Sequence, residues 1–193
     1  MRLRNAHLLI LAAVGAALVL GLAMWATAQI RARQNLAYDF RLTDQDGKPF
    51  RLSDERGRAV AVFFGYSRCL DTCPDTLTHL ASARRSLGPA AAATRVIFIT
   101  VDPHYDTPRV LKAYLAHFDP SFIGLTGSEA ELAPVYRAYH VWYQALPQTN
   151  AGREELEAHT ATVWIIDRNG HPAGFAGSTD TTSDLARDLR EAS

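Results

Sequence analysis

The feature that most constrains the fold of this chain is an unbroken apolar run from Ala59 to Phe64, which ends at Gly65. A strand with apolar side chains on both faces belongs inside a sheet that is covered on both sides. Two further short apolar runs resemble strands, and three amphipathic stretches between and after these runs have helical spacing. The expected strands are Val96–Val101 and Phe122–Leu125, and the expected helices are Pro74–Leu87, Thr107–Phe118 and Glu129–Tyr139.

Two hairpins are expected at the ends of the same domain. The first covers Tyr38–Leu52 with a turn at Asp46-Gly47, and the second joins Thr160–Ile166 to Pro172–Phe175. Val141–Ala158 has no clear period and is expected to be a long loop with at most a short hairpin. With a last helix over Thr182–Glu191, the pattern predicts an α/β fold with a mixed central sheet, of which the thioredoxin fold is one example.

The amino-terminal segment differs sharply from the rest of the chain. Leu8–Ala28 carries no charge, and Thr27 is its one polar residue. A helix of that length rises about 30 Å, enough to cross a bilayer. A cleaved signal peptide is the alternative, although signal peptides have apolar runs of only about 7 to 15 residues. We expect an uncleaved membrane anchor and linker over residues 1–33, followed by a domain over residues 34–193.

Charge and length restrict the function of the domain. The chain has 20 basic and 20 acidic residues and no basic run, so the sequence has no electrostatic signature of nucleic-acid binding. A domain of this length buries an adequate core without disulfides or structural metals. The two cysteines are therefore free for chemistry.

Cys69 and Cys73 directly follow the buried strand, at an edge where α/β sheets usually bind ligands. Pro74 suits the first turn of a helix, which places Cys73 at or near the helix start. Helix amides lower the pKa of a nearby thiol and stabilise its thiolate, so we expect Cys73 to be reactive.

The three-residue spacing between the cysteines leaves three interpretations open. A local disulfide would close a small ring and stabilise little. A redox couple more often has a two-residue spacer. Two thiolates without a further cysteine suit copper(I), because structural zinc normally takes four protein ligands.

A third metal ligand would most naturally be a histidine. His104 follows a strand end on the same side as the cysteines, and His159 stands between the long loop and a strand. Spacing alone does not rank one above the other. Asp71 and Asp102 are expected either to support the ligands or to cap and turn the chain.

Phe63–Pro74, a buried strand that runs into a Cys-x3-Cys-Pro loop, resembles the signature of the Sco/SenC family. Phe40–Phe50, Val101–Pro108 and His159–Ala161 support the resemblance, which covers about residues 36–176. Leu70 departs from the proline that the family usually has after the first cysteine, and His104 stands where the family often has an acidic residue.

The resemblance implies a thioredoxin-like, membrane-anchored protein that binds copper, as Cu(I) or Cu(II), through Cys69, Cys73 and His159. Family members help to build the dinuclear copper centre of cytochrome c oxidase. The implied partners are the copper-centre subunit of the oxidase and another copper chaperone or a thiol reductant. The expected location is the inner membrane of a bacterium, with the domain in the periplasm.

Two functions remain open at this point. A copper chaperone uses all three residues, whereas a thiol-disulfide reductase needs only Cys69 and Cys73 as a redox pair. His159 therefore distinguishes the binding protein from the enzyme.

Overall fold

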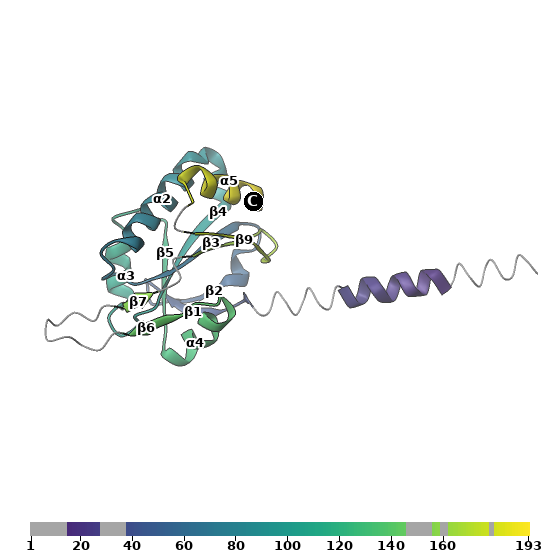
Figure 1. The fold of residues 1–193 in the computed structure, drawn as a ribbon, viewed down its shortest axis with the longest axis horizontal. Helices are drawn as coiled ribbons and strands as arrows, with labels where there is room; N and C mark the ends of the chain where they lie inside the picture. Colours follow the sequence, from purple (N-terminus) through teal and green to yellow (C-terminus); the bar gives the residue numbers. More distant parts are fainter. Residues whose placement is uncertain (1–14, 28–37, 146–155, 159–161, 178–179) are drawn as a thin grey trace, which may run out of the picture. The chain divides into compact units, whose positions relative to one another are not determined.

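The computed structural model describes residues 15–27, 38–145, 156–158, 162–177 and 180–193. The chain divides into two compact units, Met1–Ala37 and Tyr38–Ser193. In the first unit, residues 15–27 form a helix (Figure 1). None of the helices formed by described residues is both long and apolar enough to cross a bilayer. Residues 8–14 and 28 of the predicted anchor lie outside the described residues.

The second unit is built on a seven-stranded sheet with the order β2-β1-β5-β4-β3-β8-β9 (Figure 1). Its central strands β3, β4 and β5 are parallel, and the outer strands are antiparallel to their neighbours. The strands are β1 Arg41–Asp44, β2 Pro49–Arg51, β3 Ala59–Gly65, β4 Thr94–Thr100, β5 Ile123–Thr126, β8 Val163–Ile166 and β9 Pro172–Ala176. The predicted α/β fold with a mixed sheet and an N-terminal hairpin is therefore confirmed.

Alternate residues of β3 enter two separate cores. Every residue of this strand is buried, as its apolar run predicted. Ala59, Ala61 and Phe63 pack on one face of the sheet, and their neighbours in sequence pack on the other. Complete burial of a large side chain such as that of Phe63 contributes roughly 1.5–3 kcal/mol to the free energy of unfolding. The strand therefore holds the two layers together.

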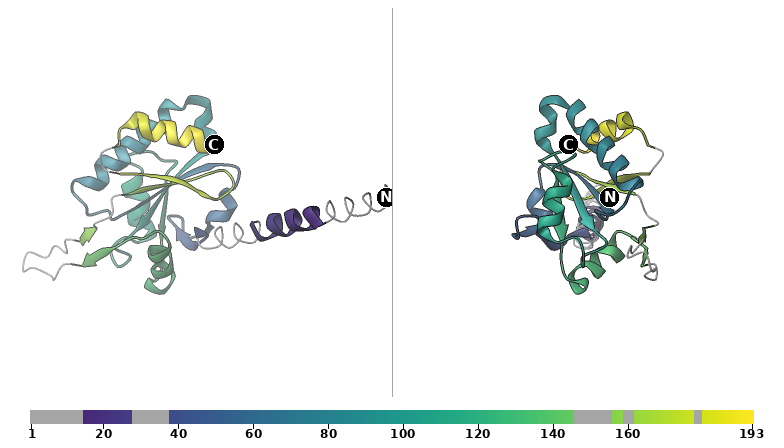
Figure 2. Two further views of the ribbon diagram at one scale, coloured as in Figure 1. Left: turned by 45° about the vertical axis from the view of Figure 1, so that its right-hand side comes forward. Right: turned by 90° about the vertical axis from the view of Figure 1, so that its left-hand side faces the viewer.

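The helices divide between the two faces of the sheet (Figures 1 and 2). Buried side chains of three helices share one core: α2 Thr72–Ser86, α3 Pro108–Leu115 and α5 Thr182–Ala192. The other core contains buried side chains of α4, Glu129–Ala138. Two short 3-10 helices, Leu52–Glu55 and Gly88–Ala93, complete the connections.

The bounds of some predicted elements differ in detail from the structure. Helix α2 begins at Thr72, two residues before the predicted start at Pro74. Amides in the first turn of a helix have no acceptor within the helix, so a proline fits at any position of that turn. Helix α3 ends at Leu115 and not at Phe118. Within the predicted long loop, β6 Tyr143–Ala145 and β7 Leu156–Ala158 pair as an antiparallel hairpin, in agreement with the short hairpin allowed there.

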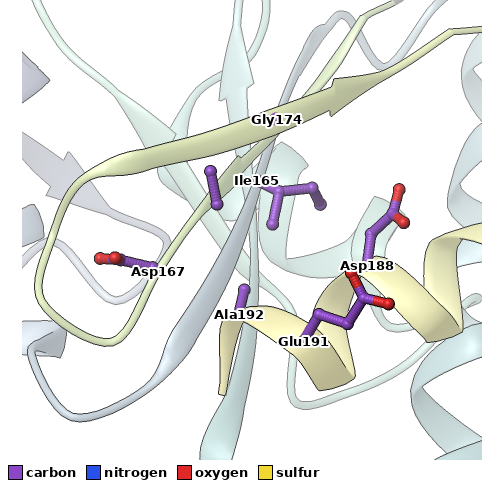
Figure 3. Close-up of a pocket in the computed structure, with 7 residues that line it drawn as sticks. Ile165, Asp167, Gly174, Asp188, Glu191 and Ala192 are labelled. Atoms are coloured by element: carbon purple, nitrogen blue, oxygen red, sulfur yellow. The ribbon is translucent and has the colours of Figure 1, made fainter.

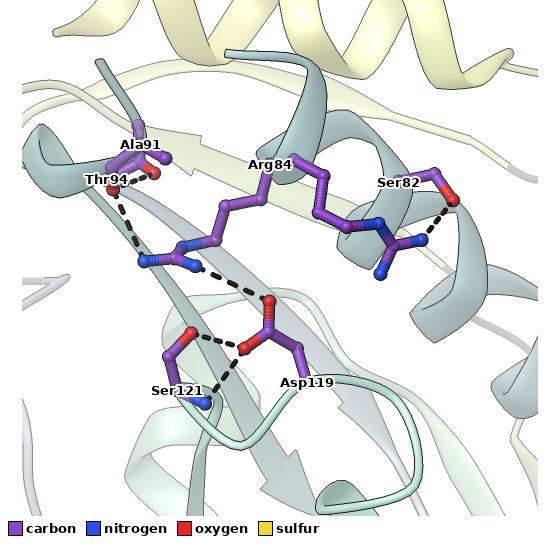
Figure 4. Close-up of polar contacts among 7 residues, drawn as sticks. Ser82, Arg84, Ala91, Thr94, Asp119 and Ser121 are labelled. Atoms are coloured by element: carbon purple, nitrogen blue, oxygen red, sulfur yellow. Dashed lines mark hydrogen bonds and ion pairs between the residues drawn. The ribbon is translucent and has the colours of Figure 1, made fainter. Parts of the chain in front are cut away.

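A polar network joins α2 to the segment between α3 and β5 (Figure 4). One guanidinium nitrogen of Arg84 lies 3.4 Å from the Asp119 carboxylate, and another donates to the Ala91 carbonyl at 3.4 Å. Ser121 donates to Asp119 through its amide and its hydroxyl. Burial opposes the charge of Asp119, but these hydrogen bonds and the guanidinium hold its pKa below the usual value. The helix that carries Cys73 is thus fixed through its last turn to the segment that precedes β5.

Gly65, the last residue of β3, allows α2 to approach the sheet. A Cβ atom at this position would lie 2.7 Å from the Cys73 sulfur and 2.9 Å from the Phe98 ring. Both neighbours are buried, with 4% and 0% of their surface exposed, so neither can move away freely. Only glycine permits this packing.

We predict that Gly65→Ala lowers the free energy of unfolding by about 1–3 kcal/mol, the usual cost of overpacking a core. Urea denaturation followed by circular dichroism measures the change. Gly174→Ala in β9 is the matched control, because a Cβ there meets nothing within 4 Å. Its effect should stay below about 0.5 kcal/mol. An equal loss of stability in both variants would contradict the steric explanation.

Candidate functional site

Two loops leave the sheet side by side at the end where the cysteines lie. Strands β3 and β4 pair in parallel over their whole length, with Gly65 opposite Thr100. The next residues of each strand form loops, residues 66–71 before α2 and residues 101–107 before α3. The amide of Val101 also donates to the Gly65 carbonyl at 2.8 Å, which extends the pairing into the second loop. The predicted position of the cysteine loop, beyond the end of a buried strand, is confirmed.

The structure brings the two cysteines together as free thiols. Cys69 is half-buried in its loop, and Cys73 is the second residue of α2 and is 4% exposed. The backbone amide of Cys73 donates to the Cys69 sulfur at 3.3 Å. A loop of three intervening residues therefore places the Cys69 sulfur directly over the start of the helix.

The environment separates the pKa values of the two thiols. A hydrogen bond from the Cys73 thiol, together with backbone hydrogen bonds from Cys73 and Asp71, lowers the pKa of Cys69 to about 5 although burial opposes this. The hydrogen bond to Cys69 and burial both raise the pKa of Cys73. Cys69 is therefore the thiolate at neutral pH, and Cys73 holds the proton.

The prediction that Cys73 is the reactive thiolate is wrong. Its position near the helix start was predicted correctly, but the helix amides face the sulfur of Cys69 and not its own. The Cys73 side chain instead packs among apolar residues of one core. Burial in such surroundings disfavours a charged sulfur.

A buried carboxylate holds the beginning of the cysteine loop. Asp106, which is 0% exposed, accepts hydrogen bonds from the Ser67 amide at 3.0 Å and from the Ser67 hydroxyl. It also accepts one from the Thr100 hydroxyl at 2.7 Å. Burial raises the pKa of Asp106, although its hydrogen bonds oppose the shift. Sequence reasoning missed this contact because Asp106 and Ser67 are 39 residues apart. The Asp-Thr-Pro sequence that begins at Asp106 also resembles an ordinary helix start.

A second link between the loops lies nearer the surface. Arg68 donates to Asp102 at 2.6 Å, and its guanidinium lies 4.4 Å from the centroid of the Tyr105 ring. Of the two roles left open for Asp102, the structure thus shows support of the cysteine loop through an ion pair. Asp71 occupies the N-cap position of α2, and its side chain makes no capping hydrogen bond. Leu70, between the cysteines, is 82% exposed.

The structure does not bring His104 to the cysteines. Its ring nitrogen lies 3.0 Å from the Glu129 carboxylate, and its side chain is 81% exposed. The described part of the chain contains no group of three or more His, Cys, Asp or Glu side chains that could hold a metal ion. His159, the third predicted ligand, lies outside the described residues.

A hollow of about 300 Å³ lies between β8, β9 and α5 (Figure 3). The carboxylates of Asp167, Asp188 and Glu191 line it. Since β8 runs antiparallel to β3, with Ile166 opposite Val60, this hollow is at the far end of the sheet from the cysteine loop. It is no part of the dithiol site.

Comparison with known proteins supports the sequence resemblance. The family model described as SCO1/SenC matches residues 28–193. The SCO2-like protein of Rickettsia felis is 36% identical over 132 residues, which cover 68% of this chain and 64% of that protein. Mitochondrial SCO1 of Saccharomyces cerevisiae is 34% identical over 139 residues, which cover 72% of this chain and 47% of that protein. The matched part of this chain thus spans less than two thirds of either relative.

Solved structures agree with the fold. The copper-bound structure of Bradyrhizobium japonicum ScoI has a TM-score of 0.73 at 36% identity, and covers 80% of this chain and 98% of that one. Copper-bound yeast Sco1 has a TM-score of 0.72 at 30% identity, covering 79% and 85%. The match of the family model over most of the sequence, together with these relatives, shows that the chain belongs to the SCO1/SenC family.

Proposed function

We propose that this protein is a copper metallochaperone that binds copper through Cys69, Cys73 and His159. In this role it assists assembly of the dinuclear copper centre of cytochrome c oxidase. The observation that carries the proposal is the pair of adjacent free thiols, in which the Cys73 amide lies 3.3 Å from the Cys69 sulfur. The copper-bound structures of ScoI and yeast Sco1 support the choice of metal.

The two sulfurs suit a soft metal ion of low coordination number. Thiolates are the soft ligands that select copper(I), and a metal ligand must be deprotonated. Because Cys69 is already a thiolate at neutral pH, Cys73 is the one thiol that must lose its proton when both sulfurs become ligands. Bound copper supplies the charge that replaces this proton in the buried position.

The chain near His159 is compatible with a role as third ligand. Val163, four residues later, begins β8 and lies opposite Phe63, two residues before Gly65. Four residues span at most about 14 Å, so the length of the chain alone limits how far position 159 can be from the start of β8. On its other side, β7 belongs to a hairpin at the same end of the domain as the start of α2 (Figures 1 and 2).

Thiol-disulfide reduction is the second function that the geometry favours. The half-exposed Cys69 thiolate would attack a disulfide of a partner, forming a mixed disulfide and releasing one partner thiolate. Cys73, after losing its proton, would then attack the Cys69 sulfur and release the second partner thiolate. The partner gains two electrons, and this chain becomes the disulfide. Cysteines of the oxidase subunit or of another exported protein are the proposed substrates, and a thiol reductant would restore the dithiol.

The apolar segment Leu8–Ala28 supports a single-pass anchor in the inner membrane, with the domain in the periplasm. The family match begins at residue 28, at the end of this segment. The proposed partners are the copper-centre subunit of the oxidase, and another copper chaperone as the donor. The anchor would hold the dithiol near a membrane-bound partner.

Copper binding is tested first, by an anaerobic copper(I) competition titration on the reduced full-length chain. We predict one tightly bound copper per chain, with affinity reduced at least about tenfold by Cys73→Ser and by His159→Ala, because each removes a ligand. His104→Ala is the matched control and should leave the affinity unchanged, since His104 pairs with Glu129. Weak binding that His159→Ala does not alter would contradict the chaperone and leave the reductase.

The asymmetry of the thiols predicts their pH dependence. Because the pKa of Cys69 is lowered to about 5, its alkylation rate by iodoacetamide should rise between about pH 4 and 6 and stay level above. Peptide mass spectrometry should find the modification at Cys69. Cys73→Ala removes the donated hydrogen bond and should move the midpoint upward, toward the ordinary value of about 9. Preferential modification of Cys73 would refute the assignment.

A further inference from the structure

Three hydrogen-bond donors converge on the Asp106 carboxylate. The Ser67 amide lies 3.0 Å from Oδ2, the Thr100 hydroxyl lies 2.7 Å from the same atom, and the Ser67 hydroxyl donates to Oδ1. Asp106 is completely buried, so water does not compete for these bonds. A hydrogen bond to a carboxylate contributes more than one between two neutral groups.

Asp106 is itself held firmly. Its amide donates to the Asp102 carbonyl at 2.9 Å, and Thr100 is the last residue of β4. The carboxylate therefore links the cysteine loop to the end of the neighbouring strand. Ser67 is two residues before Cys69, whose amide in turn donates to the Tyr66 carbonyl at 3.2 Å.

We propose that Asp106 is a positioning residue for the dithiol: its hydrogen bonds to Ser67 keep the Cys69 sulfur within bonding distance of Cys73. The proposal deepens the proposed function, because it rests on the same two sulfurs as the working site. Asp106 acts through Ser67 and the loop, and it needs no contact with a metal or a substrate.

The consequence is thermodynamic. Formation of the Cys69–Cys73 disulfide depends on the effective concentration of one thiol at the other, which a restrained loop keeps high and a free loop lowers. With glutathione disulfide as oxidant, the two sulfurs join, and two electrons and two protons pass to glutathione as two thiols. The equilibrium constant of this exchange therefore measures how strongly the cysteine loop keeps the two sulfurs close together.

The test is the equilibrium constant for disulfide formation in glutathione buffers, measured on the metal-free full-length chain. Asp106→Ala should lower it at least tenfold, which raises the reduction potential by about 30 mV. Asp106→Asn should stay within about threefold of the native chain. Its amide oxygen accepts from the Ser67 amide and Thr100, and its NH2 group donates to the Ser67 hydroxyl.

Two further variants keep the test decisive if Asp106→Ala fails to fold. Ser67→Ala removes one of the two bonds to the loop and should lower the constant at least threefold. Thr100→Val removes the hydroxyl that donates to Asp106 and accepts from the Asp102 amide, but it leaves both bonds between Asp106 and Ser67. It should therefore change the constant less than about twofold even where it destabilises the fold.

Native behaviour of Ser67→Ala and Asp106→Ala would overturn the proposal. So would an effect of Thr100→Val as large as that of Asp106→Ala, since stability alone would then set the constant. A loss in Asp106→Asn equal to that in Asp106→Ala would assign the effect to charge and not to position. All of these readouts are obtained without copper, so the proposal can fail while copper binding by the dithiol stands.

Discussion

The in-register parallel pairing of β3 with β4 is the constraint on which the rest of the structure depends. All seven residues of β3 pair with β4, so both strands end at the same level and their loops emerge as neighbours. Because β3 is also buried on both faces, its alternate side chains define the two cores that receive the helices. One buried strand thus separates the two cores of the domain and determines where the cysteine loop begins. It also brings this loop close enough to the next one for Asp106 to bind Ser67.

The two sulfurs differ because they meet the same helix start from different sides. Cys69 approaches the amides from outside the helix, whereas Cys73 belongs to the helix and points into a core. One thiol is therefore charged and half-exposed, and the other is protonated and buried. This division of roles suits a pair that first captures a metal ion or a partner sulfur from solution and then secures it with the second cysteine.

Much of the fold was predictable, because its signals are local. The apolar run of β3 requires a covered sheet, and Asp46-Gly47 marks the first hairpin, where Gly47 adopts a φ of 76°. Which of the two thiols is charged depends on which sulfur accepts hydrogen bonds from the helix amides. The spacing Cys-x3-Cys alone does not predict this. Helix α2 likewise begins before Pro74, since a proline fixes the first turn but not its first residue.

The parts of the site that sequence reasoning missed are contacts between distant segments. Asp106 meets Ser67 across 39 residues, and the space at Gly65 is filled by Cys73 and Phe98. No periodicity or motif records such a contact in a single sequence. The side of the sheet on which His104 lies was predictable from the strand before it, but its pairing with Glu129, at the start of another helix, was not.

Cys69 packs against both hydrophobic cores, although the sheet otherwise separates them. A bond formed at the Cys69 sulfur restrains a residue that both layers touch. A single sulfur atom thus belongs to a residue that is in contact with side chains on both faces of the sheet.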